Sequence, residues 1–111
     1  MSKRTLGGFE TILILAVLRL GDNAYGVSIR HELLTRAEKD VAIGAIYTAL
    51  ERLERKGFVE SHLGEPTSIR GGRAKRYYRL TCRGLKTFND THRAIQGLMV
   101  GLNLAGGNVN V

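Results

Sequence analysis

The sequence has little of several residue types, and each shortage excludes a class of protein. Its 111 residues include one proline, one cysteine and no tryptophan. A single cysteine, Cys82, cannot close an intrachain bridge, which excludes a disulfide-stabilised scaffold, and the low proline content excludes a collagen-like chain. Because 43% of the residues are hydrophobic, the chain can bury one core. We therefore expect one folded domain, or one domain with a short appendage.

Long hydrophobic runs are also missing. The longest apolar run, residues 12–18, has seven residues, whereas a membrane-spanning helix needs about 20. The first residues carry charge but lack the apolar stretch that a secretion signal requires. These features predict a cytoplasmic protein that does not associate with membranes.

Acidic residues are absent from one part of the chain. The 17 Lys and Arg residues and 10 Asp and Glu residues give a net charge of +7. Residues 66–86 contain seven of the basic side chains and no acidic one, whereas the remaining basic and acidic residues are equal in number. The net charge is therefore a local patch. Such a patch attracts polyanions, among which nucleic acid is the commonest.

Residue types that often act in catalysis or bind metals are present, but their spacing does not match that of a catalytic or metal site. His31, His62 and His92 lack metal-ligand spacing and have no cysteine beside them. A redox-sensing role for Cys82 is a less common alternative to a structural one. We therefore predict that the protein is not an enzyme and has no catalytic residues, no metal and no cofactor.

Hydrophobic spacing predicts four helices and one hairpin. Helical periodicity is present in residues 9–20, 25–37 and 44–56 and again after Thr81, while residues 58–63 and 75–81 are typical of strands. Three helices, a hairpin and a further helix give a mainly α (α+β) fold with winged helix-turn-helix order. We expect a DNA-binding domain at residues 1–81, a C-terminal dimerisation helix at 82–105 and a flexible tail at 106–111.

The third predicted helix has the features of a helix that enters DNA. A major groove is about 12 Å wide and admits one α-helix, which the preceding helix supports from behind. Small and hydrogen-bonding side chains lie on its outer face and flanks, and a glycine- and arginine-rich loop follows it. The predicted DNA contacts are Tyr25, Gly44, Ala45, Tyr47, Thr48, Arg52, Arg70, Gly72, Arg73, Lys75 and Arg76. A plain solvated helix face is the alternative, but the neighbouring basic segment favours DNA.

Two apolar surfaces predict a homodimer. The helix at residues 9–20 is apolar on all sides, and a short chain has little material to cover it. The last helix has apolar residues at heptad-like spacings. The predicted dimer interface consists of Leu13, Val17, Leu85, Phe88, His92, Ile95, Met99 and Leu102.

Four segments together resemble the PadR family of bacterial transcriptional regulators. They are Thr11–Leu18, Tyr25–Gly26, Gly44–Gly57 and Arg70–Thr81, and the resemblance covers roughly residues 6–85. It implies a winged-helix fold, a homodimer formed through the C-terminal helix, and repression by operator binding. The family's recognition-helix tyrosine corresponds to Tyr47, and its wing corresponds to Gly71, Gly72, Arg73, Lys75 and Arg76. Ala42 and Ala45 differ from the Ser or Thr that such proteins often carry.

The function predicted from the sequence is sequence-specific transcriptional regulation. We expect a repressor that binds double-stranded DNA at a pseudo-palindromic operator as a homodimer. One alternative is a winged-helix module whose basic hairpin contacts an acidic protein. Another is a ligand-gated regulator with a pocket for a small-molecule effector at the dimer interface.

Overall fold

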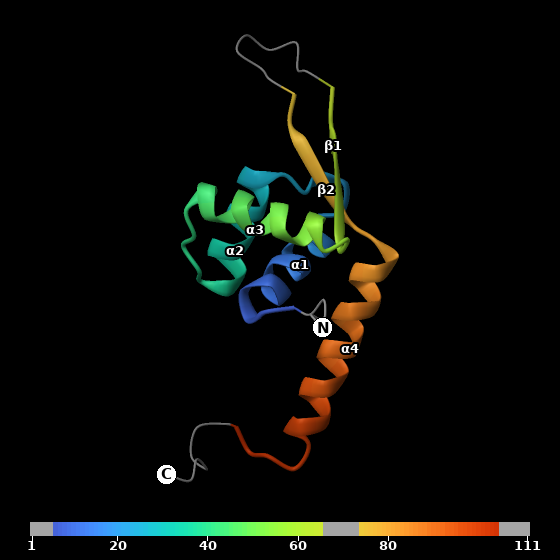
Figure 1. The fold of residues 1–111 in the computed structure, drawn as a ribbon. Coiled ribbons are helices and arrows are strands. Elements are labelled where there is room, and N and C mark those ends of the chain that lie inside the picture. Colours follow the sequence, from blue (N-terminus) through green and yellow to red (C-terminus); the bar gives the residue numbers. More distant parts are fainter. Residues whose placement is uncertain (1–5, 66–73, 105–111) are drawn as a thin grey trace.

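The computed structural model describes residues 6–65 and 74–104. The element order is α1 (Gly8–Leu20), a short 3-10 turn η1 (Gly21–Asn23), α2 (Gly26–Ala37), α3 (Ile43–Arg55), β1 (Val59–Leu63), β2 (Arg76–Leu80) and α4 (Cys82–Met99). Helices α1 to α3 form the body, the β1–β2 hairpin projects from it, and α4 runs away from it in another direction (Figure 1). The predicted winged-helix fold is confirmed, and we call the hairpin, residues 59–80, the wing.

The core lies where the three helices of the body meet the root of the wing. Each helix contributes the apolar residues of one side, as helical spacing requires. The largest fully buried side chains are Leu13, Ile14, Ile29, Leu33, Ile46, Leu50, Leu53, Phe58 and Val59. Because α3 buries Ile46, Leu50 and Leu53, its other side faces outward.

The chain reverses direction between α3 and β1 at Gly57. This residue has φ +84°, a left-handed conformation that glycine adopts without steric penalty. The turn is closed by hydrogen bonds from Gly57 N–H to Glu54 C=O and from Phe58 N–H to Leu53 C=O, each 2.9 Å long. The predicted end of the third helix at Gly57 is therefore confirmed, and the turn carries Phe58 into the core.

The wing is an antiparallel pair in which Val59 lies opposite Leu80 and Ser61 opposite Tyr78. Its inner face is apolar at the root, where Val59 and Tyr78 are buried. An isolated bridge joins Tyr25 to Tyr77, and Tyr78 N–H donates to Ala24 C=O over 2.9 Å. These bonds fix the root of the wing to the segment that precedes α2.

Helix α4 is attached to the body at its first turn. The Thr81 hydroxyl caps the helix by accepting from Gly84 N–H and donates to Gly57 C=O over 2.6 Å. At Gly84 a Cβ would lie 2.1 Å from the Phe58 carbonyl oxygen, so the close packing there requires glycine. Gly84 is the one buried residue of α4, all of whose residues the structure describes. Phe88, in the second turn, also packs against the core, and the helix then extends beyond the body (Figure 1).

Two dimer-interface predictions for α1 are wrong. Leu13 is 0% exposed and Val17 is 2% exposed, because both pack into the core of their own chain. The exposed apolar residues of α1 are Leu15 and Leu18, each 42% exposed. A helix that is apolar on all sides gives no sequence signal for which side faces the core.

The predicted span of the C-terminal helix is also too long. The helix ends at Met99, and Gly101 follows with φ +84°, a left-handed conformation that ends a helix readily. Leu102 continues the heptad-like spacing in the sequence but lies beyond the end of the helix, where it is exposed.

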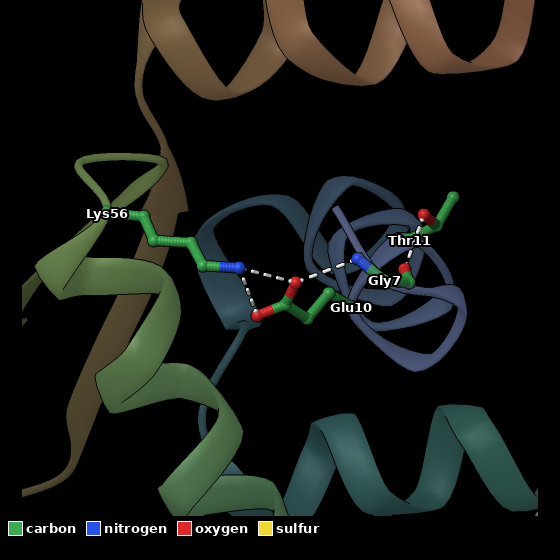
Figure 2. Close-up of polar contacts among 4 residues, drawn as sticks. All are labelled: Gly7, Glu10, Thr11 and Lys56. Atoms are coloured by element: carbon green, nitrogen blue, oxygen red, sulfur yellow. Dashed lines mark hydrogen bonds and ion pairs between the residues drawn. The ribbon is translucent and has the colours of Figure 1, made fainter. Parts of the chain in front are cut away.

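A partly buried ion pair connects the start of α1 to the end of α3 (Figure 2). The Glu10 carboxylate accepts from Lys56 Nζ at 2.9 and 3.0 Å and from Gly7 N–H at 2.9 Å. Glu10 is 6% exposed. Burial raises the pKa of Glu10, but the hydrogen bonds from Gly7 and Lys56 outweigh it, so the pKa lies below its usual value.

Candidate nucleic-acid interface

The structure brings the predicted contact residues of α3 together on its exposed side. All five, Gly44, Ala45, Tyr47, Thr48 and Arg52, are exposed. The Thr48 hydroxyl donates to Gly44 C=O over 3.0 Å, which leaves its oxygen able to accept a further hydrogen bond. The outer face therefore offers a hydroxyl and a guanidinium within one turn of each other.

The start of α3 has small side chains and no side-chain cap. Ala42 occupies the N-cap position without a capping hydrogen bond, and the first turn contains no acidic residue. At Gly44 a Cβ would meet nothing within 4 Å. A glycine inside a helix costs about 0.5–1 kcal/mol relative to alanine. Within the described part of the chain, no packing contact requires glycine at this position.

Tyr47 reaches from α3 to the start of α2. A Cβ at Gly26 would lie 2.2 Å from the Tyr47 hydroxyl oxygen and 2.5 Å from its Cζ atom, so Tyr47 occupies the space of a side chain there. A side chain at Gly26 would therefore displace the Tyr47 ring, whereas one at Gly44 would meet nothing. Sequence reasoning singled out Tyr25–Gly26 as part of a family resemblance but did not find this contact.

Aromatic rings join the wing to the body beside α3. The Tyr25 and Tyr77 rings meet edge to face with centroids 5.6 Å apart, and His62 stacks on Tyr77 at 5.8 Å. Lys75 Nζ lies 4.5 Å from the centroid of the Tyr25 ring, a cation–π contact. Two predicted DNA contacts, Tyr25 and Lys75, therefore touch each other.

Arg76 is the other predicted wing contact that the structure describes. Its Nη1 donates to Ser61 Oγ over 3.1 Å, and the Ser61 hydroxyl donates to Glu54 Oε2 over 2.9 Å. The predicted contacts Arg70, Gly72 and Arg73 lie outside the described residues. Lys75 thus contacts the residue that precedes α2, and Arg76 is linked to α3 through Ser61 and Glu54.

The predicted interface residues of α4 form an exposed apolar stripe. Leu85, Ile95 and Met99 are 44–47% exposed. Phe88 is partly buried against the core, and its ring stacks on His92 with centroids 5.8 Å apart. No contact within the described chain covers the C-terminal half of this stripe.

The described residues contain no group of three or more His, Cys, Asp or Glu side chains that could hold a metal ion. Cys82 is exposed at the first position of α4. In the same ranges, every helix is too short or too polar to cross a bilayer.

The comparisons with known proteins agree with this geometry. A family model, the transcriptional regulator PadR-like family, matches residues 14–90. A PadR family transcription regulator from Clostridium difficile R20291 is 32% identical, with 83% of this chain and 95% of that chain covered and a TM-score of 0.66. A PadR-like transcription factor from Bacteroides fragilis is 26% identical, with 82% and 84% covered and a TM-score of 0.66.

A third structure, the complex hsRosR-S4, is 26% identical, with 88% of this chain and 77% of that chain covered and a TM-score of 0.64. No curated protein matches the sequence. The family match spans more than half of the chain, and regulators of this kind are generally non-enzymatic. The chain therefore belongs to the PadR-like family of transcriptional regulators and has its DNA-binding winged-helix fold.

Proposed function

We propose that the protein is a repressor that binds a pseudo-palindromic operator as a homodimer, with α3 in the major groove and the wing beside it. The observation that carries this proposal is the outer face of α3, where Gly44, Thr48 and Arg52 are exposed on the side opposite the buried residues. A helix that projects such a face from a rigid body can enter a groove without any change in the core.

The positions of the side chains suggest separate roles on DNA. Thr48 and Arg52 point outward from α3, so we assign them to base edges, which carry sequence information. Tyr47 lies at the flank against the start of α2, so we assign it to a phosphate, whose bonds fix position without reading sequence. Gly44 leaves room for a sugar–phosphate backbone to approach the uncapped start of α3.

The basic residues at the root of the wing extend this surface. Lys75 Nζ lies over the Tyr25 ring and Arg76 donates to the Ser61 hydroxyl, so in the described part of the chain both cations contact neutral groups. We assign both to phosphates, where a cation displaces condensed counterions. Arg70, Gly72 and Arg73 remain proposed contacts on the basis of sequence.

A second copy of the chain would cover the apolar surfaces left exposed on α1 and α4. Helix α4 contacts the body through its first two turns, as far as Phe88, and its exposed stripe continues to Met99. Burying apolar surface of this kind is the main driving force for association. We therefore propose an interface formed by α4 with Leu15 and Leu18 of α1, in place of Leu13 and Val17.

Selection from a pool of random duplexes tests this function. The full-length protein should bind duplex DNA with an affinity that falls steeply as salt rises, because phosphate contacts release counterions. The selected sites should be inverted repeats with half-site centres about 34 Å apart or a multiple of that distance. A reporter gene placed under such a site should be repressed. Absence of salt-dependent duplex binding would contradict the proposal and favour an acidic protein partner.

A further inference from the structure

We propose that Ser61 is a positioning residue for DNA binding. Its hydroxyl connects the Arg76 guanidinium to Glu54 of α3 and so fixes the position of Arg76 relative to that helix. We call this pair of hydrogen bonds the relay. This inference rests on the proposed function, because it concerns how a wing arginine reaches phosphate. Arg76 belongs to β2, Ser61 to β1 and Glu54 to α3. The hydroxyl accepts from Arg76 Nη1 over 3.1 Å and donates to Glu54 Oε2 over 2.9 Å, so one side chain connects three elements.

The place of this relay on the wing explains why it affects orientation more than stability. Ser61 and Arg76 lie on the inner face of the hairpin, diagonal to each other, because Ser61 is opposite Tyr78 and Arg76 is opposite Leu63. Val59 and Tyr78 are buried nearer the root, whereas Leu63 is exposed farther out. The relay therefore lies between the buried root of the inner face and its exposed outer part. Exposed polar contacts of this kind add little to folding stability.

The chemistry of the relay keeps Arg76 available to an anion. Arg79 on the outer face pairs directly with the Glu60 carboxylate, which offsets its charge. Arg76 instead meets a neutral hydroxyl, and the carboxylate of Glu54 is one hydrogen bond farther away. A guanidinium has five N–H donors, and the bond to Ser61 uses one of them. The others can bind phosphate from a side chain that the bond to Ser61 already restrains, which lowers the entropy lost on binding.

Substitution of Ser61 tests the relay without changing any charge. Ser61→Val removes the hydroxyl and Ser61→Thr keeps it, and both residues are favourable in a strand. We expect Ser61→Val to weaken binding to a random-sequence duplex about two- to fivefold at fixed low salt, as loss of one exposed polar contact implies. Ser61→Thr should bind as the unsubstituted protein does. Thr35→Ala, which removes a hydroxyl bonded to His31 C=O on α2, is the matched control and should leave affinity unchanged.

A double-mutant cycle distinguishes positioning from a general structural effect. If Ser61 acts through Arg76, Ser61→Val should have no further effect in an Arg76→Ala background. An equal loss of affinity in both backgrounds, or no loss in either, would overturn the relay while leaving the proposed function intact. Failure of the unsubstituted protein to bind duplex would overturn both. Ser61→Ala provides a second variant without the hydroxyl, and circular dichroism confirms that each variant is folded.

Discussion

Helices α3 and α4 both present an exposed face to solvent, but the two faces differ in chemistry. The face of α3 has small and polar side chains on a helix that packs into the core along its whole buried side. The face of α4 is apolar on a helix with one buried residue, Gly84. A polar face on a fixed helix suits a polyanion, whereas an apolar face on a projecting helix suits a second copy. The proposed function thus assigns DNA binding and dimerisation to different helices.

The largest effect is expected from Ile95→Asp, which places a charge on the apolar face of α4 and should abolish dimerisation. The unsubstituted protein should sediment at micromolar concentration as a dimer of 12.2 kDa chains. An unpaired charge buried at the interface costs several kcal/mol, so the variant should be monomeric and lose operator binding. Ala94→Asp, at an exposed position on the opposite side of α4, is the control and should remain dimeric. A folded monomer for the unsubstituted protein would contradict the assignment of this face.

Substitutions on α3 should separate reading from positioning. Arg52→Ala and Thr48→Ala should each cost about 1–3 kcal/mol on a selected operator and little on random duplex. Tyr47→Phe should weaken both complexes alike, because phosphate contacts carry no sequence information. Anisotropy titrations with the two duplexes measure the difference. If Tyr47→Phe alters sequence preference and the other two do not, the assigned roles on this helix are wrong.

The Glu10–Lys56 pair should affect the stability of the body but neither DNA binding by α3 nor dimerisation through α4. Because the pKa of Glu10 is lowered on folding, its contribution to stability is present above the unfolded-state pKa and is lost as pH falls through the folded-state value. Glu10→Gln should therefore lower the free energy of unfolding at pH 7 by about 1.5–3 kcal/mol, the range for hydrogen bonds to charged groups. The difference in the free energy of unfolding between this variant and the unsubstituted protein should become smaller as pH falls. Urea titrations from pH 7 to 3 measure it, and a gap that widens in acid would refute the assignment.

The smallest effect is expected from alanine substitution at two glycines that have free space around them. At both Gly44 and Gly97 an added Cβ meets nothing within 4 Å, and both lie in helices. Replacement by alanine should leave each variant as stable as before or up to about 1 kcal/mol more stable. Gly44→Ala should weaken duplex binding because the methyl group occupies the space proposed for the DNA backbone, whereas Gly97→Ala should not. Thermal unfolding and anisotropy titrations give the two readouts, and equal duplex affinities would contradict close approach at Gly44.

The sequence predicted the order of the elements and the outer face of α3, because the stripe of Ile46, Leu50 and Leu53 has a clear helical phase. It failed for Leu13 and Val17, because α1 is apolar on all sides and its phase is set by packing in three dimensions. It also extended the last helix to Leu102, because heptad spacing continues through Gly101. The Tyr47–Gly26 contact depends on how two helices cross, which local spacing does not encode.

Mapping of backbone amide chemical shifts during titration with duplex DNA tests most directly which face binds DNA. The signals of Gly44, Ala45, Thr48 and Arg52 should move most, together with those of Lys75 and Arg76 at the root of the wing. The signals of the apolar stripe on α4 should remain in place, because that face is proposed to be covered by the second copy. Shifts confined to α4, with the signals of α3 unmoved, would contradict the separation of the two faces.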